Sequence, residues 1–300
     1  MEGTLNVRTD LALEAREDIK PKKGEIDGVI MSVIPENNLI KVTFVEIQNE
    51  RGSSLMKKPC GKYYTVEASD IQYGNDEYKE EVSKVIHKYL RELSYASTGM
   101  KNPRVLVVGL GNREVTPDSV GPNAVDMLEI SENIMGVAPG VLAQTGMETA
   151  RIVKGIAAEN RPDLVIAVDA LAARSTKRLN TTIQLSNTGI HPGSGVGNHR
   201  WGITEENIGV PIIAIGVPTV VDAPTIISDT LDNILNELQP DSDIKKLNND
   251  NKYELIKKLI MPEIAQMFVT PKDIDATAKI LGLIIANAIN MTFDVNNTAG

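Results

Sequence analysis

Residues 104–109 read RVLVVG and residues 164–168 read LVIAV, and these two stretches decide the fold. Each is a short, continuous apolar run rich in valine or isoleucine, which is typical of a parallel strand covered by helices on both faces. Similar runs occupy residues 182–185 and 212–217, and helical patterns lie between the runs. This alternation predicts an α/β fold of three layers, α/β/α, with a mostly parallel sheet.

Helices are expected at residues 75–96, 119–135, 148–159 and 222–238. A last helix is expected after Thr270 as N-cap and Pro271 at its first position. Ahead of the first helix, segments 28–34, 39–47 and 62–67 indicate a small antiparallel β unit with a Pro-Glu-Asn-Asn turn. We therefore expect an N-terminal arm over residues 1–24, a β subdomain over 25–75 and an α/β catalytic domain over 76–300.

The composition narrows the class of protein. A net charge of −9 argues against direct binding of nucleic acid, although it permits basic partners. The single cysteine excludes an internal disulfide and a cysteine-based zinc cluster, and it fits a reducing compartment. The first residues lack a signal-peptide pattern, and the apolar stretch at 210–221 is broken by two prolines and a glycine. We expect a cytoplasmic protein that does not enter a membrane.

Two aspartates follow the two defining strands. Asp118 comes shortly after the first strand, and Asp169 directly follows the second. Because ligands of parallel sheets bind beyond the carboxyl ends of the strands, both carboxylates are expected in one crevice. There they would form an acid–base pair or half of a metal site. Each also has a structural alternative, Asp118 as a helix N-cap and Asp169 as a turn residue.

A glycine-rich loop, HPGSGVGNH, occupies residues 191–199. So many glycines indicate either close backbone approach to a bound peptide or a plain surface loop. Backbone N–H groups of this loop, or Arg174, are candidates for stabilising an oxyanion. The candidates for substrate or oxyanion contacts are Arg174, His191, Gly193, Ser194 and Gly195. A dinucleotide site is disfavoured, because Glu114 stands where the third glycine of that fingerprint belongs.

Several motifs together resemble the spore germination protease family of endospore-forming bacteria. They are VVGLGN at 107–112, VTPDSVGP at 115–122, DLVIAVDALAARS at 163–175 and TTIQLSNTGIHPGSGVGN at 181–198, and the resemblance covers nearly the whole chain. It implies a phosphorylase/hydrolase-like fold similar to that of hydrogenase maturation proteases. It also implies an atypical aspartic protease, made as a tetrameric zymogen, that degrades the small acid-soluble proteins coating spore DNA. Carried over to this chain, its two catalytic aspartates are Asp118 and Asp169.

The chain departs from the family in length. Segments 131–142 and 239–262 look shortened, which bears on oligomer contacts and zymogen control more than on chemistry. The family's substrates are cut after an acidic residue and before a large apolar residue followed by alanine. Residues 9–14 of this chain, TDLALE, have that form, which predicts self-cleavage between Asp10 and Leu11. The alternative is an ordinary helix start at the same residues.

Three hypotheses follow. The first is an endopeptidase that uses the Asp118–Asp169 pair without a cofactor, acting on small acid-soluble proteins in the developing spore or spore core. The second is a metallopeptidase in which Asp118, Asp169 and His191 hold a divalent ion that activates water. The third is a non-catalytic spore protein that binds basic DNA-coat proteins through its acidic surface. The resemblance also implies a homo-oligomer, a tetramer.

Overall fold

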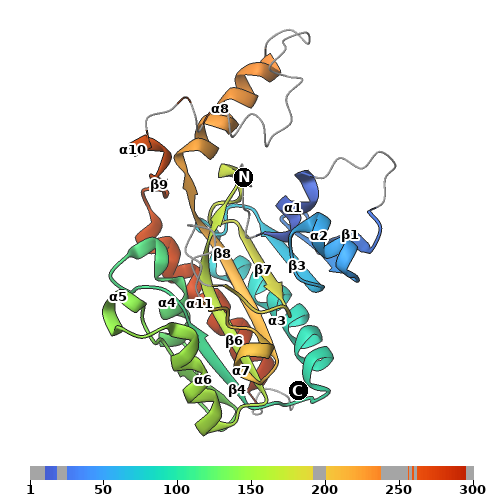
Figure 1. The fold of residues 1–300 in the computed structure, drawn as a ribbon, viewed down its shortest axis with the longest axis vertical. Coiled ribbons are helices and arrows are strands. Elements are labelled where there is room, and N and C mark those ends of the chain that lie inside the picture. The colour runs from blue at the N-terminus through green and yellow to red at the C-terminus, as the bar shows by residue number, and fades with distance from the viewer. Residues whose placement is uncertain are drawn as a thin grey trace, which may run out of the picture.

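The computed structural model describes residues 11–18, 26–191, 201–237, 256, 259 and 262–294. Within these residues a nine-stranded mixed sheet has the order β1-β2-β3-β7-β8-β6-β4-β5, and β9 pairs with β8 (Figure 1). The strands are β1 (Val29–Pro35), β2 (Ile40–Ile47), β3 (Gly61–Ala68), β4 (Val105–Gly109), β5 (Ile134–Val137), β6 (Leu164–Ala173), β7 (Thr182–Ser186), β8 (Ile212–Asp222) and β9 (Phe268–Val269).

Helices cover both faces of this sheet, which confirms the expected three layers. They are α1 (Ala12–Asp18), α2 (Glu50–Met56), α3 (Asp76–Thr98), α4 (Val120–Asp126), α5 (Leu142–Thr145), α6 (Thr149–Asn160), α7 (Glu205–Ile208), α8 (Ala223–Glu237), α10 (Pro262–Ala265) and α11 (Ile274–Phe293). One face carries α3, α4 and α11. The opposite face carries α6 and α7 beside β4 and β6, and α1 and α2 beside β2 and β3.

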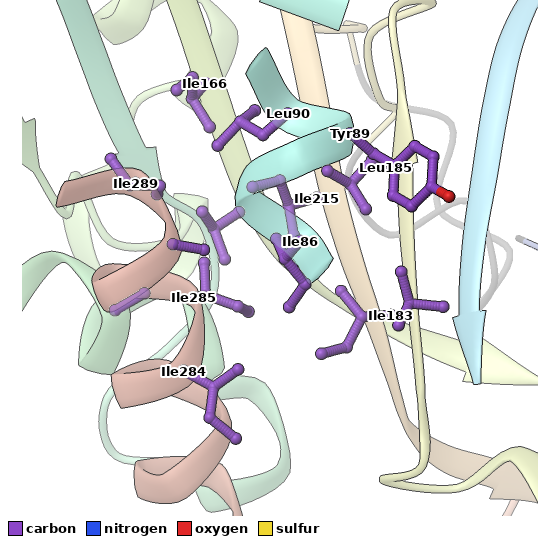
Figure 2. Packing of buried hydrophobic residues seen from close by; sticks show 14 of the residues in the cluster. Ile86, Tyr89, Leu90, Ile166, Ile183, Leu185, Ile215, Ile284, Ile285 and Ile289 are labelled. Carbon is purple, nitrogen blue, oxygen red and sulfur yellow. The ribbon is translucent and has the colours of Figure 1, made fainter. Parts of the chain in front are cut away.

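The main core lies between the sheet and the pair α3–α11 (Figure 2). Apolar residues recur along α11 at the helical spacing, so one side of this helix faces the core. Ile284, Ile285 and Ile289 are buried on that side. Each fully buried side chain of this kind contributes about 1.5–3 kcal/mol. By length and composition α11 could also cross a membrane, but 67% of its apolar window is buried inside the protein. That burial is typical of a core helix.

The sheet is less parallel than expected. Strands β5, β4, β6 and β8 are parallel to one another, whereas β7 runs antiparallel to both β3 and β8. The connection from β6 to β7 holds only the short 3₁₀ turn η2 (Thr176–Arg178), and a crossover to a parallel strand needs a dozen residues or more. The chain therefore turns back at the edge where β6 ends.

Two expected helix boundaries are wrong. The helix expected over 119–135 ends at Asp126, and residues 134–137 form β5 beside β4. The polar stretch between them, which contains Glu129, Ser131 and Glu132, breaks the helical pattern. The last helix has Asp273 rather than Thr270 as its N-cap. Thr270 instead donates its hydroxyl to the carbonyl oxygen of Thr219 on β8, at 2.8 Å.

The three N-terminal strands form the antiparallel unit that the sequence predicts. β3 then pairs with β7, so the strands of residues 25–75 continue the central sheet. The connection between β2 and β3 also holds α2, which the sequence pattern did not indicate. Asn49 caps α2 by accepting a hydrogen bond from the backbone N–H of Gly52.

Candidate active site

A cavity of about 620 Å³ opens on the face of the sheet that carries α1, α2, α6 and α7. The alternation of side chains along β7 explains its character: Ile183 and Leu185 enter the main core, so Gln184 and Ser186 face the cavity. On β8 the matching residues are Ala214 and Gly216. Small residues at the centre of the sheet thus leave room for a ligand.

Asp169 lies in the wall of this cavity and is 6% exposed. It stands within β6 rather than past its end, because β6 continues to Ala173. Its Oδ1 accepts a hydrogen bond from the backbone N–H of Ala170 at 3.0 Å. In the sheet register Asp169 pairs with Gly216, which pairs with Gln184. Asp169 and Gln184 therefore face each other across a residue without a side chain.

Asp118 lines the same cavity from the loop after β4. It ends the 3₁₀ turn η1 (Thr116–Asp118), and its Oδ2 accepts a hydrogen bond from the N–H of Asn112 at 2.8 Å. Its structural alternative was the N-cap of the next helix, but the N-cap of α4 is Ser119. The hydrogen bond from Leu110 N–H to the Val168 carbonyl, at 2.8 Å, joins the end of β4 to the residue of β6 that precedes Asp169. Both aspartates are thereby brought to one cavity.

The residues predicted to contact the substrate or an oxyanion do not all line the cavity. His191 lines the cavity, whereas Arg174 is not among the described residues of its wall. Gly193, Ser194 and Gly195 lie outside the described residues. For the metal alternative, His191, Asp118 and Asp169 share the cavity, but no group of three His, Cys, Asp or Glu side chains in the described part of the chain is placed to hold one ion.

Lys58 and Gln184 are among the polar residues of the cavity wall that sequence reasoning missed. Lys58 is the one lysine or arginine among the described lining residues, and Gln184 faces Asp169 as described above. A signal for Gln184 existed, because it interrupts an apolar run at the position that points away from the core. Lys58 follows α2, and nothing in the local pattern sets it apart from the other lysines.

The segment after Asp10 reaches the edge of this cavity. Leu11 and Ala12 are fully buried, and the N–H of Ala12 donates to Oε1 of Gln184 at 2.6 Å. Residues 12–18 form α1, so a helix does begin here. Asp10, on the other side of the predicted cleavage bond, lies outside the described residues.

Comparison with known proteins gives one consistent result. The family model described as germination protease matches residues 6–243. The chain is 44% identical to a germination protease of Caldanaerobacter subterraneus subsp. tengcongensis, over 96% of this chain and 94% of that protein. It is 42% identical to the germination protease of Clostridium tetani, over 96% and 95% of the two chains. For that of Bacillus velezensis the identity is 38%, over 95% and 92%.

Proposed function

Because the chain belongs to the germination protease family, and is thus a peptidase of spore germination, we propose that Asp118 and Asp169 perform its peptide hydrolysis. The observation that carries this proposal is that both carboxylates line one cavity, Asp118 from the loop past the carboxyl end of β4 and Asp169 from the part of β6 just beyond its pairing with β4. Substrate crevices of parallel sheets lie at this edge.

The chemistry needs one base and one acid. In the proposed mechanism the two carboxylates share one proton, because two like charges at close range are costly. The ionised carboxylate takes a proton from a water molecule. At the same time the oxygen of this water molecule attacks the peptide carbonyl carbon. The protonated carboxyl then donates its proton to the leaving nitrogen as the carbon–nitrogen bond breaks. One proton is taken and one is given, so the pair is ready for another turnover after a proton exchange with solvent.

The substrates we propose are the small acid-soluble proteins of the spore, cut after an acidic residue. The cavity suits a peptide in two respects. It is about 620 Å³ in volume, and its described wall combines two carboxylates with one lysine and one histidine. The acidic net charge of −9 favours encounter with basic DNA-coating proteins.

We also propose that the enzyme is a zymogen that cuts its own Asp10–Leu11 bond. The support is the position of Ala12, whose N–H is bonded to Gln184. Gln184 and Asp169 are two strands apart in one cross-strand row, which is about 10 Å at a strand spacing of about 4.8 Å. Leu11 directly precedes Ala12, and an extended residue spans about 3.5 Å, so the bond before Leu11 is within reach of the cavity. The tetrameric assembly that the family resemblance implies is part of the same proposal.

One incubation tests this function against its metal-dependent rival. Processed enzyme is mixed with a purified small acid-soluble spore protein, with and without exhaustive chelation, and the fragments are identified by mass spectrometry. The proposal expects the same cuts after acidic residues in both samples. Loss of cutting in chelator, restored by one divalent ion, would transfer the function to a metallopeptidase. Intact substrate in both samples would favour a binding protein.

A further inference from the structure

The loop after β4 holds an asparagine side chain in one orientation. Oδ1 of Asn112 accepts the backbone N–H of Glu114 at 3.0 Å, which closes an Asx turn. It also accepts a hydrogen bond from Nε2 of Gln144, on α5, at 2.7 Å. Oε1 of Gln144 in turn accepts the backbone N–H of Val141 at 3.3 Å. The carbonyl end of the Asn112 side chain is therefore held by two donors from two segments of the chain.

The two backbone donors fix which end of each amide is the oxygen. A backbone N–H can only donate, so the amide atoms that face the N–H groups of Glu114 and Val141 are oxygens. The nitrogen of the Asn112 amide must then lie at the opposite end of the side chain. No hydrogen bond joins this Nδ2 to the residues that the structure describes. Asn112 thus has two side-chain N–H donors available for a ligand.

Asn112 lies directly beside one of the two aspartates. Its backbone N–H donates to Oδ2 of Asp118 at 2.8 Å, and both residues line the cavity. The turn and α5 hold the oxygen end of the Asn112 amide. The nitrogen end is therefore the one that can meet a peptide bound next to Asp118.

Hydrolysis by two carboxylates needs a further hydrogen-bond donor. As the water oxygen bonds to the peptide carbonyl carbon, the π electron pair of the carbonyl moves onto its oxygen. In the proposed mechanism one carboxylate takes the proton of the water, and the other protonates the leaving nitrogen. Neither neutralises the carbonyl oxygen, so a donor fixed at that position lowers the barrier.

The cations near the cavity are placed less well for this task. Lys58, the one lysine or arginine among the described wall residues, precedes β3. In the sheet order β3 is four strands from β4, which is about 19 Å at a strand spacing of about 4.8 Å. Arg174 is not among the described residues of the wall. Asn112, by contrast, stands in the same loop as Asp118.

We infer that Asn112 is a catalytic residue of this peptidase, whose Nδ2 donates a hydrogen bond to the oxyanion on the carbonyl of the cleaved peptide. When the carbon–nitrogen bond breaks, the electron pair returns from the oxygen and re-forms the carbonyl, so Asn112 neither gains nor loses a proton. Gln144 is a positioning residue, because it acts only through Oδ1 of Asn112. The inference rests on the proposed function and adds a third group to its two carboxylates.

The test compares Asn112→Asp with wild type on a peptide whose cut has been located by mass spectrometry. Aspartate keeps the shape and the acceptor oxygen of the Asx turn but removes both N–H donors. We expect kcat to fall by about 10²-fold and KM to stay within about twofold, because the lost bond forms only in the transition state. Asn75→Asp is the matched control. Asn75 caps α3 and is not among the described wall residues, and aspartate is an equally good cap, so kcat should be unchanged.

A second substrate separates a lost donor from a disturbed loop. In this substrate the carbonyl oxygen of the cleaved amide is replaced by sulfur, a weak hydrogen-bond acceptor. The ratio of the amide rate to the thioamide rate should be at least about tenfold smaller in Asn112→Asp, and in the uncharged Asn112→Ser, than in wild type. The intrinsic reactivities of the two peptides cancel in this comparison. A merely structural role of Asn112 would slow both peptides equally and leave the ratio unchanged.

Gln144→Leu keeps the inference testable if neither variant at position 112 folds. The Gln144 side chain is exposed, so its replacement leaves the core intact. We expect kcat to fall by about fivefold, the scale of one neutral hydrogen bond, and the amide-to-thioamide ratio to fall with it. Near-normal kcat of folded Asn112→Asp, or an unchanged ratio in the variants, would overturn the inference and assign the oxyanion to another donor. If wild-type enzyme cuts no peptide at all, the proposed function itself fails.

Discussion

At the scale of single residues, the place of Asp118 depends on a glycine. Gly111 has a φ of +110°, and a Cβ at that position would lie 1.9 Å from the carbonyl oxygen of Asp118. The loop after β4 thus folds back onto itself in a way that no side chain at position 111 permits. Asn112, the next residue, donates the N–H that Asp118 accepts.

We predict that Gly111→Ala lowers kcat/KM by about 10²-fold, because a displacement of about 1 Å at a catalytic group costs that much. The measurement is cleavage of a small acid-soluble protein, with near-ultraviolet circular dichroism to confirm that the variant is folded. Gly146→Ala is the control. Gly146 also has a positive φ, +68°, but nothing lies within 4 Å of its Cβ position, so activity should be unchanged. Full activity of folded Gly111→Ala would show that Asp118 does not need this loop geometry.

A second prediction at this scale concerns Tyr63, whose hydroxyl donates to the carbonyl oxygen of Pro59 at 2.7 Å. Burial, which outweighs a hydrogen bond with Thr188, raises the pKa of Tyr63 to about 12. Because an unfolded tyrosine has a pKa near 10, the folded state favours the neutral phenol, and this stabilisation is complete below a pH of about 10. It is lost as the pH rises towards about 12.

Tyr63→Phe should therefore lower the free energy of unfolding by about 1 kcal/mol at pH 7, through the lost hydrogen bond. The difference from wild type should shrink between a pH of about 10 and about 12, since only the wild type titrates at this position. Urea unfolding of both proteins across that range is the measurement. The other buried tyrosines are common to the two proteins and cancel in the difference. A constant difference up to pH 12 would contradict the raised pKa.

At the scale of elements, the periodicity of apolar residues along the sequence predicted most of the central strands and long helices. The strands β4, β6 and β8 and the helices α3, α6 and α11 were predicted from their periodicity to within a few residues, apart from the longer C-terminal ends of β6 and β8. The direction of β7 was not, because it depends on how short its connection to β6 is. β5 was missed because four residues, IMGV, are too few to show a period.

The approach of α4 to the sheet is a further property of elements, and it rests on Gly121. A Cβ there would lie 2.4 Å from the carbonyl oxygen of Leu110 and 2.5 Å from that of Val168. Leu110 directly follows β4, and Val168 directly precedes Asp169 on β6. We predict that Gly121→Ala lowers the free energy of unfolding by about 3 kcal/mol, because backbone cannot shift as a flexible side chain does.

Gly155→Ala, in the exposed middle of α6, is the control for this change. Nothing lies within 4 Å of its Cβ position, so the substitution should raise helix stability by about 0.5–1 kcal/mol. Urea denaturation measures both variants. Equal stability of Gly121→Ala and wild type would mean that α4 does not pack this closely on the strands.

At the scale of the whole molecule, the candidate site is assembled from segments far apart in the chain. Both aspartates could be predicted, because each follows its own strand pattern and matches a family motif. The contact of Ala12 with Gln184 could not, since it joins residues 172 positions apart through a strand whose direction was unforeseen. The pairing of Glu14 with the turn after β6 escaped prediction for the same reason.

Because Ala12 is bonded to Gln184 of its own chain, self-processing should be intramolecular. We predict a first-order rate constant for loss of residues 1–10 that does not change over a hundredfold range of protein concentration. N-terminal sequencing should find Leu11 first. When tagged Asp169→Asn protein is mixed with wild type, the tagged chain should stay uncut. A rate constant that rises with concentration, together with cutting of the tagged chain, would show that neighbouring molecules do the cutting.

The central claim is that Asp118 and Asp169 together perform the hydrolysis, and its most direct test is the cleavage rate of the two Asn variants. Asp118→Asn and Asp169→Asn keep the side-chain volume but remove the group that takes or gives a proton. Each is made as a protein that already begins at Leu11, so that processing does not limit the rate. Each variant should keep the wild-type circular dichroism spectrum and cut a small acid-soluble protein at least about 10²-fold more slowly. Near-normal cleavage by either folded variant would contradict the two-aspartate mechanism.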